Sequence, residues 1–208
     1  IDGHGEEGNV PYTSTEKIVD KLIEYIDNNC GGKLFAVSGV SLGGQIAIEL
    51  LSRRKDIAEK AIVESGICIP QPFLLKCSVF VVKLCGKLMF SKAFNKWGLK
   101  RLPKRMQLPE DIAELYMRDI TSMKTETMNR IFETYYQYEM KESLKDSQAD
   151  TIYWYGGKEM KCIKQSAKLF QSYVKKCKVI ELKGYCHSEI SAYHPEEWVE
   201  KAEEFFNN

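Results

Sequence analysis

The sequence predicts an α/β fold in which helices flank a mostly parallel sheet and a helical insertion interrupts that sheet. Near both ends of the chain, short apolar runs alternate with helical patterns, as in parallel strands joined by crossover helices. The middle of the chain breaks this alternation and carries only helical patterns. We therefore expect a core made of residues 1–67 and 148–208, with residues 68–147 inserted between its two parts.

The first part of the core contains two predicted strands. An apolar stripe over residues 18–26 predicts a helix, and the apolar run 34–37, bounded by glycines, predicts a strand buried on both faces. Residues 45–51 form a helical pattern and residues 61–63 a second buried strand. This order of helices and strands indicates parallel pairing.

The insertion is predicted to be helical, and Pro109 followed by two acidic residues marks one helix start. Residues 73–90 are apolar, but three lysines interrupt them, so we expect no integral membrane segment. From residue 71 to residue 107 there are nine Lys or Arg and no acid, with residues 76–105 forming the basic stretch. One interpretation is an amphipathic face for anionic lipid or an acidic substrate, and the other is a solvated face on a packed helix.

The second part of the core repeats the alternation of strands and helices. Residues 151–155 and 179–182 are predicted strands, with a helix over 165–174 between them. The last helix begins at Pro195. Its side chains expected to face inward are Trp198, Val199, Ala202, Phe205 and Phe206.

Composition excludes several classes of protein. The chain has 208 residues and a mass of 23.9 kDa, which favours one domain with an insertion. A net charge of +1 gives no overall basic excess, so we expect no nucleic-acid partner. Seven scattered cysteines without a CxxC pair indicate reduced thiols in a cytoplasmic protein. No metal ion or cofactor is implied.

The motif that carries chemistry is G-x-S-x-G at residues 39–43, between a predicted strand and a predicted helix. In this context Ser41 is held in a strained turn, and Gly39 and Gly43 remove side chains that would clash. The amide of Leu42 can donate to a developing oxyanion at the helix start. The alternative is a glycine-rich turn that happens to contain a serine.

The sequence Asp-Gly-His-Gly at residues 2–5, the turn at 39–44 and a late acid and histidine together resemble the α/β-hydrolase superfamily. The resemblance covers nearly the whole chain apart from the insertion, which would be a helical cap. It implies catalytic partners in the order serine, acid, histidine, on loops after successive strands.

A serine hydroxyl needs a base to take its proton, and the sequence offers three histidines. By resemblance His4 is a structural loop residue, and His194, directly before Pro195, is expected to help cap the last helix. His187 follows a predicted strand at the place where the superfamily carries its base. Position and elimination both favour His187.

The acid is predicted from a turn that resembles the superfamily's strand-Gly-x-x-acid pattern. Gly156 and Gly157 follow a strand and precede Glu159, which is the favoured candidate. The alternatives are that Glu159 is an exposed loop carboxylate, or that Glu64, at the end of the second strand, is the acid.

The sequence thus predicts a serine hydrolase that cleaves a small to medium carboxylic ester through Ser41, His187 and Glu159, with Leu42 as an oxyanion donor. A lyase or acyltransferase acting on an anionic metabolite, and a non-catalytic ligand-binding protein, are the alternatives. The oligomeric state stays open. The resemblance also implies earlier strands and a second oxyanion donor upstream of Asp2, so we expect the native protein to be longer.

Overall fold

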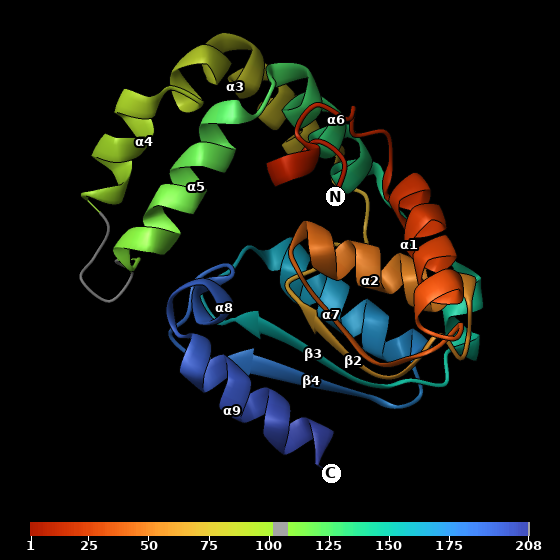
Figure 1. Ribbon diagram of the computed structural model, residues 1–208. Coiled ribbons are helices and arrows are strands. Elements are labelled where there is room, and N and C mark those ends of the chain that lie inside the picture. Colours follow the sequence, from red (N-terminus) through yellow and green to blue (C-terminus); the bar gives the residue numbers. More distant parts are fainter. Residues whose placement is uncertain (102–107, 208) are drawn as a thin grey trace. The chain divides into compact units, whose positions relative to one another are not determined.

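The structure is a computed structural model that describes all residues except 102–107 and 208 (Figure 1). Two compact units make up the chain, each formed from two separate stretches: Ile1–Ser14 with Gln71–Tyr136, and Thr15–Pro70 with Gln137–Asn208. The predicted insertion, 68–147, includes the helical stretch of the first unit and also the segment that leads back to the sheet.

A four-stranded parallel sheet forms the centre of the second unit, as the sequence predicts (Figure 1). The strands lie in the order in which they occur along the chain, and each pairs in parallel with the next. All four carboxyl ends therefore meet at one edge of the sheet. The strands are β1 (Leu34–Val40), β2 (Ala58–Glu64), β3 (Asp150–Gly156) and β4 (Cys177–Leu182).

Strand β1 differs from its prediction as a strand buried on both faces. Its side chain Phe35 is 58% exposed, and Ser38 is also exposed. Within the described residues β1 is an edge strand, paired only with β2. An edge strand has neighbours on one side only, so its apolar residues are less covered than those of β2 and β3.

Helices cover both faces of the sheet. Helix α2 (Leu42–Arg53) contacts β1 and β2, and α7 (Lys161–Tyr173) contacts β3 and β4. Helix α1 (Thr15–Asn29) packs on α2, and Figure 1 shows all three helices on one face. Helix α9 (Pro195–Phe206) lies on the other face, following the short α8 (Glu189–Tyr193).

The core beneath α9 is an apolar cluster contributed by three strands and two helices. Its buried members are Ile62, Ile152, Trp154, Leu182, Ile190 and Ala202. Of the α9 side chains predicted to face inward, Ala202 is a member, and Trp198, Phe205 and Phe206 pack against the cluster. The prediction is wrong for Val199, which is exposed because it lies on the outer side of the helix.

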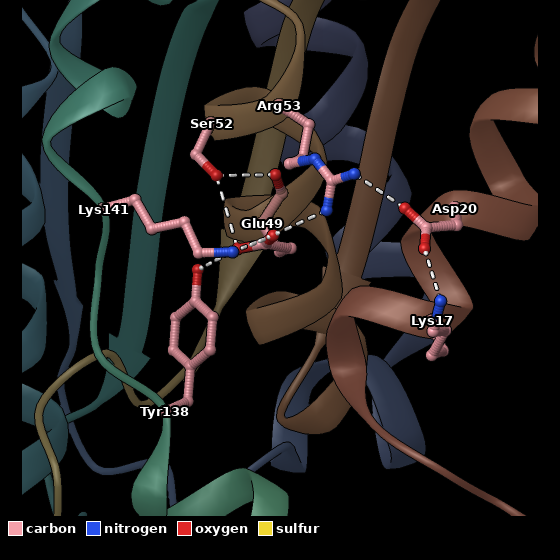
Figure 2. Close-up of polar contacts among 7 residues, drawn as sticks. All are labelled: Lys17, Asp20, Glu49, Ser52, Arg53, Tyr138 and Lys141. Carbon is pink, nitrogen blue, oxygen red and sulfur yellow. Dashed lines mark hydrogen bonds and ion pairs between the residues drawn. The ribbon is translucent and has the colours of Figure 1, made fainter.

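Helix α2 is buried around most of its circumference, including Glu49, which is fully buried. Figure 2 shows that Glu49 accepts hydrogen bonds from Tyr138 Oη (3.1 Å) and Lys141 Nζ, while Arg53 Nη1 lies 3.5 Å away. Arg53 also donates to Asp20 of α1. A buried carboxylate is costly without such partners, so this cluster ties α2 to α1 and to the segment that leads back to the sheet before β3.

The first unit is helical. It contains a short 3-10 helix at Gly5–Glu7, and α5 begins directly after Pro109, as predicted. Lys104 and Arg105 of the predicted basic stretch lie outside the described residues. No helix among residues 1–101 and 108–207 is long and apolar enough to cross a membrane. The α-helices are α3 (Pro72–Met89), α4 (Lys92–Leu99), α5 (Glu110–Ser122) and α6 (Thr125–Gln137).

Candidate active site

Ser41 occupies a strained turn between β1 and α2. Its backbone has φ 55° and ψ −111°, a combination that residues other than glycine rarely adopt. The turn is held from both sides, because Ser41 N donates to Glu64 O at 2.8 Å and Gln45 N donates to Ser41 O at 3.0 Å. These bonds fix the serine where the strand ends and the helix begins.

Close packing around the turn requires glycine at two positions, one of them not predicted. A Cβ on Gly39 would overlap with the carbonyl oxygen of Gly43, as the motif predicts. The same prediction is wrong for Gly43, because a Cβ there would meet no described atom within 4 Å. Gly44 is the second position that requires glycine, since a Cβ added there would lie 2.9 Å from Glu64 O and 3.1 Å from Gly66 Cα. The start of α2 thus packs directly against the backbone that follows β2.

His187 lies on the loop that follows β4, next to Ser41. Its Nε2 is 3.0 Å from Ser41 Oγ, and its Nδ1 is 2.7 Å from Glu159 Oε2. The loop reaches this position because β3 ends in Gly156, where a Cβ would lie 2.5 Å from the carbonyl oxygens of Tyr185 and Cys186. The His187 side chain is 45% exposed, so a substrate can approach it.

Glu159 lies on the loop that follows β3, and its side chain is only 1% exposed. Its Oε1 accepts two hydrogen bonds, from Ser65 Oγ at 2.6 Å and from Gly156 N at 2.7 Å. Burial raises the pKa of this carboxyl, but the hydrogen bonds from His187, Ser65 and Gly156 outweigh burial and leave the pKa below its usual value. Glu159 is therefore ionised at neutral pH.

The charge of Glu159 determines which nitrogen of His187 carries a proton. An ionised carboxylate only accepts hydrogen bonds, so Nδ1 must be the donor to Oε2. In the neutral imidazole Nε2 is then the acceptor, and the hydroxyl of Ser41 donates to it. This tautomer is the one that can remove a proton from the serine.

Ser65 is part of the site and was not predicted from the sequence. It directly follows β2, is fully buried, and has φ 56°, which is unusual for serine. One signal could have found it, because the carboxyl ends of parallel strands meet at one edge. Ser41, Ser65, Glu159 and His187 follow β1, β2, β3 and β4 in turn. A polar residue after each strand therefore marks the candidate site.

Glu64, the other candidate acid, does not contact His187 in this arrangement. It accepts from Ser191 Oγ at 2.9 Å and from Trp198 Nε1 at 3.0 Å, beneath α8 and α9. Burial raises its pKa, and these hydrogen bonds offset the shift only in part. The structure thus places Glu64 within the polar contacts that hold α8 and α9 on the sheet.

The two remaining histidines make other contacts. His194 stands at the N-cap position of α9, but its side chain makes no capping hydrogen bond, so the predicted capping role is wrong. Its ring packs edge-on against Tyr185, with the centroids 5.3 Å apart. His4 belongs to the first unit, where its Nδ1 lies 3.0 Å from Asp2 O.

Leu42 is the first residue of α2, so its amide has no acceptor within the helix. Its position next to Ser41, at the positive end of the helix dipole, suits a donor to negative charge that develops on a bound substrate. Among the described residues, no group of three or more His, Cys, Asp or Glu side chains is arranged to hold a metal ion.

Comparisons with known proteins identify the fold. No protein-family model and no curated sequence matches the chain. Many solved structures do, at low sequence identity. One of these structures comes from a study of carboxylesterases of Nitrososphaera gargenis. It matches with a TM-score of 0.72 and 17% identity, and the match covers 100% of this chain and 77% of that chain.

Two further structures extend the comparison. A putative non-heme bromoperoxidase from Mycobacterium tuberculosis H37Rv matches with a TM-score of 0.73 and 15% identity, covering 99% of this chain and 78% of that chain. A putative alpha/beta hydrolase family protein from Desulfitobacterium hafniense matches with a TM-score of 0.69 and 19% identity, covering 94% and 78%. The chain therefore has the α/β-hydrolase fold, as the sequence resemblance implies.

Proposed function

We propose that the protein is a serine hydrolase that cleaves a carboxylic ester of small to medium size. The observation that carries this proposal is the continuous hydrogen-bonded chain from Ser41 Oγ through His187 to the buried carboxylate of Glu159. A serine, a base and an acid that orients the base are the three groups that acyl transfer through a serine requires.

In the proposed mechanism Ser41 Oγ attacks the carbonyl carbon of the ester while His187 Nε2 takes the hydroxyl proton. The Leu42 amide donates to the oxygen that becomes negative, and Glu159 stabilises the imidazolium. The tetrahedral intermediate collapses when His187 gives its proton to the leaving alcohol, which leaves an acyl group on Ser41. Water, deprotonated by the same His187, then attacks the acyl group and releases the carboxylic acid.

The choice of an ester rests on the neighbours of the same fold. They include carboxylesterases of Nitrososphaera gargenis and an esterase from Exiguobacterium antarcticum. One fold supports many reactions. The ester is therefore inferred by analogy with these neighbours, whereas the serine chemistry is inferred from the geometry of the site. We retain residues 68–147 as the proposed cap that selects the substrate.

Fluorophosphonate labelling tests the proposal, because the reagent reacts with activated serines. We expect one adduct on Ser41, located by mass spectrometry, and no adduct on the Ser41→Ala variant. Ser172→Ala is the matched control, since Ser172 is an exposed serine whose hydroxyl donates to Leu169 O. Failure of the folded wild-type protein to label would contradict the proposal.

Ester hydrolysis is the second readout. We expect turnover of p-nitrophenyl esters, with a preference along an acyl chain-length series that shows the size of the acyl site. Labelling of Ser41 without turnover of any ester would instead favour a lyase or an acyltransferase that uses the same three residues.

A further inference from the structure

Helix α3 carries several exposed apolar side chains. Phe73 is 74% exposed, Leu84 72% and Phe80 65%. These exposed fractions are far larger than those of apolar side chains on a packed helix face. We call the exposed apolar residues of this helix the outer stripe. They are Phe73, Cys77, Phe80, Val81, Leu84 and Leu88.

The opposite side of α3 is the packed one. Val82 and Gly86 are its buried residues, and an ideal Cβ on Gly86 would lie 3.3 Å from the side chain of Thr125 in α6. Both helices belong to the first unit. The outer stripe therefore does not serve the packing of α3 onto its neighbour, and an apolar surface of this kind marks an interaction site.

Helical geometry places the outer stripe beside a row of lysines. At 3.6 residues per turn, the six residues of the stripe fall within an arc of about 100°. Lys76, Lys83 and Lys87 fall within an arc of about 40° along one border of the stripe. All three lysines are exposed. We call them the lysine row.

No acidic residue interrupts this positive charge along the sequence of α3 and α4. Between residues 71 and 107 the sequence contains no Asp or Glu. Helix α4 continues the pattern, because Trp97 is exposed and Arg101 stacks over its ring at 4.5 Å. The surface of α3 thus combines an apolar strip with positive charge along its border.

We propose that α3 lies in the surface of an anionic lipid bilayer, with the outer stripe in the acyl boundary and the lysine row at the headgroups. Charge complementarity selects this occupant, since lysines attract anionic headgroups while their alkyl stems reach across the boundary. A second copy of the chain fits less well, because an antiparallel two-fold contact through the outer stripe would place the two lysine rows side by side. The proposal does not depend on the catalytic role of Ser41.

Vesicle co-sedimentation tests the proposal with the full chain. We expect binding to vesicles of phosphatidylcholine containing a quarter of phosphatidylglycerol, weaker binding to pure phosphatidylcholine, and weakening by salt. The triple variant K76Q/K83Q/K87Q should bind the anionic vesicles about 100-fold more weakly, since each lysine near such a surface contributes about fivefold.

A matched charge control separates α3 from net charge. The variant K168Q/K175Q/K178Q removes the same charge from exposed lysines of the second unit and should bind like the wild type.

Two further variants, Phe80→Ser and Leu84→Ser, test the outer stripe. Each removes an exposed apolar side chain and should leave folding intact while weakening binding by about tenfold or more. Equal binding by the wild type and the α3 variants, or no binding to anionic vesicles, would overturn the proposal. So would a concentration-dependent dimer, detected by sedimentation without lipid, that the same variants abolish. Fluorophosphonate labelling of Ser41 is measured on every variant, so loss of the catalytic site is recognised separately.

Discussion

Replacing Glu159 by glutamine should abolish the reactivity of Ser41 while preserving the fold. The structure determines how the new amide must orient. Oε1 of Glu159 accepts from Gly156 N, a backbone donor that cannot reverse its role, and from Ser65 Oγ. The amide oxygen of the glutamine must take that place, which leaves the amide NH₂ facing His187.

An NH₂ group at this position donates to His187 Nδ1, so the imidazole proton moves to Nε2. That nitrogen can then no longer accept the proton of Ser41, although the distances between the side chains hardly change. In a protease, replacing the acid of a comparable triad by its amide lowers turnover by about ten-thousand-fold for this reason. The same loss here corresponds to about 5.5 kcal/mol in the activation free energy.

The assay is the second-order rate constant of fluorophosphonate labelling at neutral pH, with urea denaturation to verify the fold. Glu64→Gln is the matched control, since Glu64 is also buried but bonds to Ser191 and Trp198. We expect Glu64→Gln to label at the wild-type rate. A labelling rate of Glu159→Gln within tenfold of the wild type would refute the tautomer argument. If Glu64→Gln labelled slowly and Glu159→Gln did not, Glu64 would instead be favoured as the acid.

Two further predictions concern the residues around the site. Ser65→Ala removes a hydrogen bond to the charged Glu159 and should lower the free energy of unfolding by about 1.5–3 kcal/mol at neutral pH. The folded-state pKa of Glu159 is lowered, so its stabilisation is present above its unfolded pKa and is lost as the pH falls through the folded value. Urea denaturation at several pH values should therefore show the difference between Ser65→Ala and the wild type shrinking in acid. An unchanged stability at neutral pH would contradict the prediction. Gly44→Ala should destabilise the protein by about 1–3 kcal/mol, because its Cβ would lie 2.9 Å from a backbone oxygen. Gly43→Ala, with open space at its Cβ, should be neutral or stabilising by up to about 1 kcal/mol, and an equal loss in both variants would argue against close packing at Gly44.

Much of the fold could be predicted because its signals are local. Short apolar runs mark the strands, and Pro109 and Pro195 mark helix starts that the structure confirms. The turn at Ser41 is also encoded locally, since Gly39 and Gly44 leave the room that its strained backbone conformation needs between a strand and a helix.

Exposure was harder to predict, since it depends on what packs against an element. Phe35 belongs to an apolar run typical of a central strand, yet β1 is an edge strand among the described residues and leaves it exposed. Val199 lies in an apolar pattern on α9 but faces outward. Glu49 is charged and nevertheless fully buried, because Arg53, Lys141 and Tyr138 surround it.

The parallel α/β architecture could be predicted from the sequence, and so could a serine, a histidine and a carboxylate that together could form one site. The architecture follows from hydrophobic periodicity, and Ser41 follows from its motif between a strand and a helix. His187 and Glu159 follow from the resemblance to the α/β-hydrolase superfamily. The contact of His187 with Glu159 rather than Glu64, and the hydrogen bond from Ser65 to Glu159, depend on how the loops meet in the folded chain. The reason is that strand register and the close approach of loops at glycines determine which side chains meet, and neither can be read from neighbouring residues in the chain.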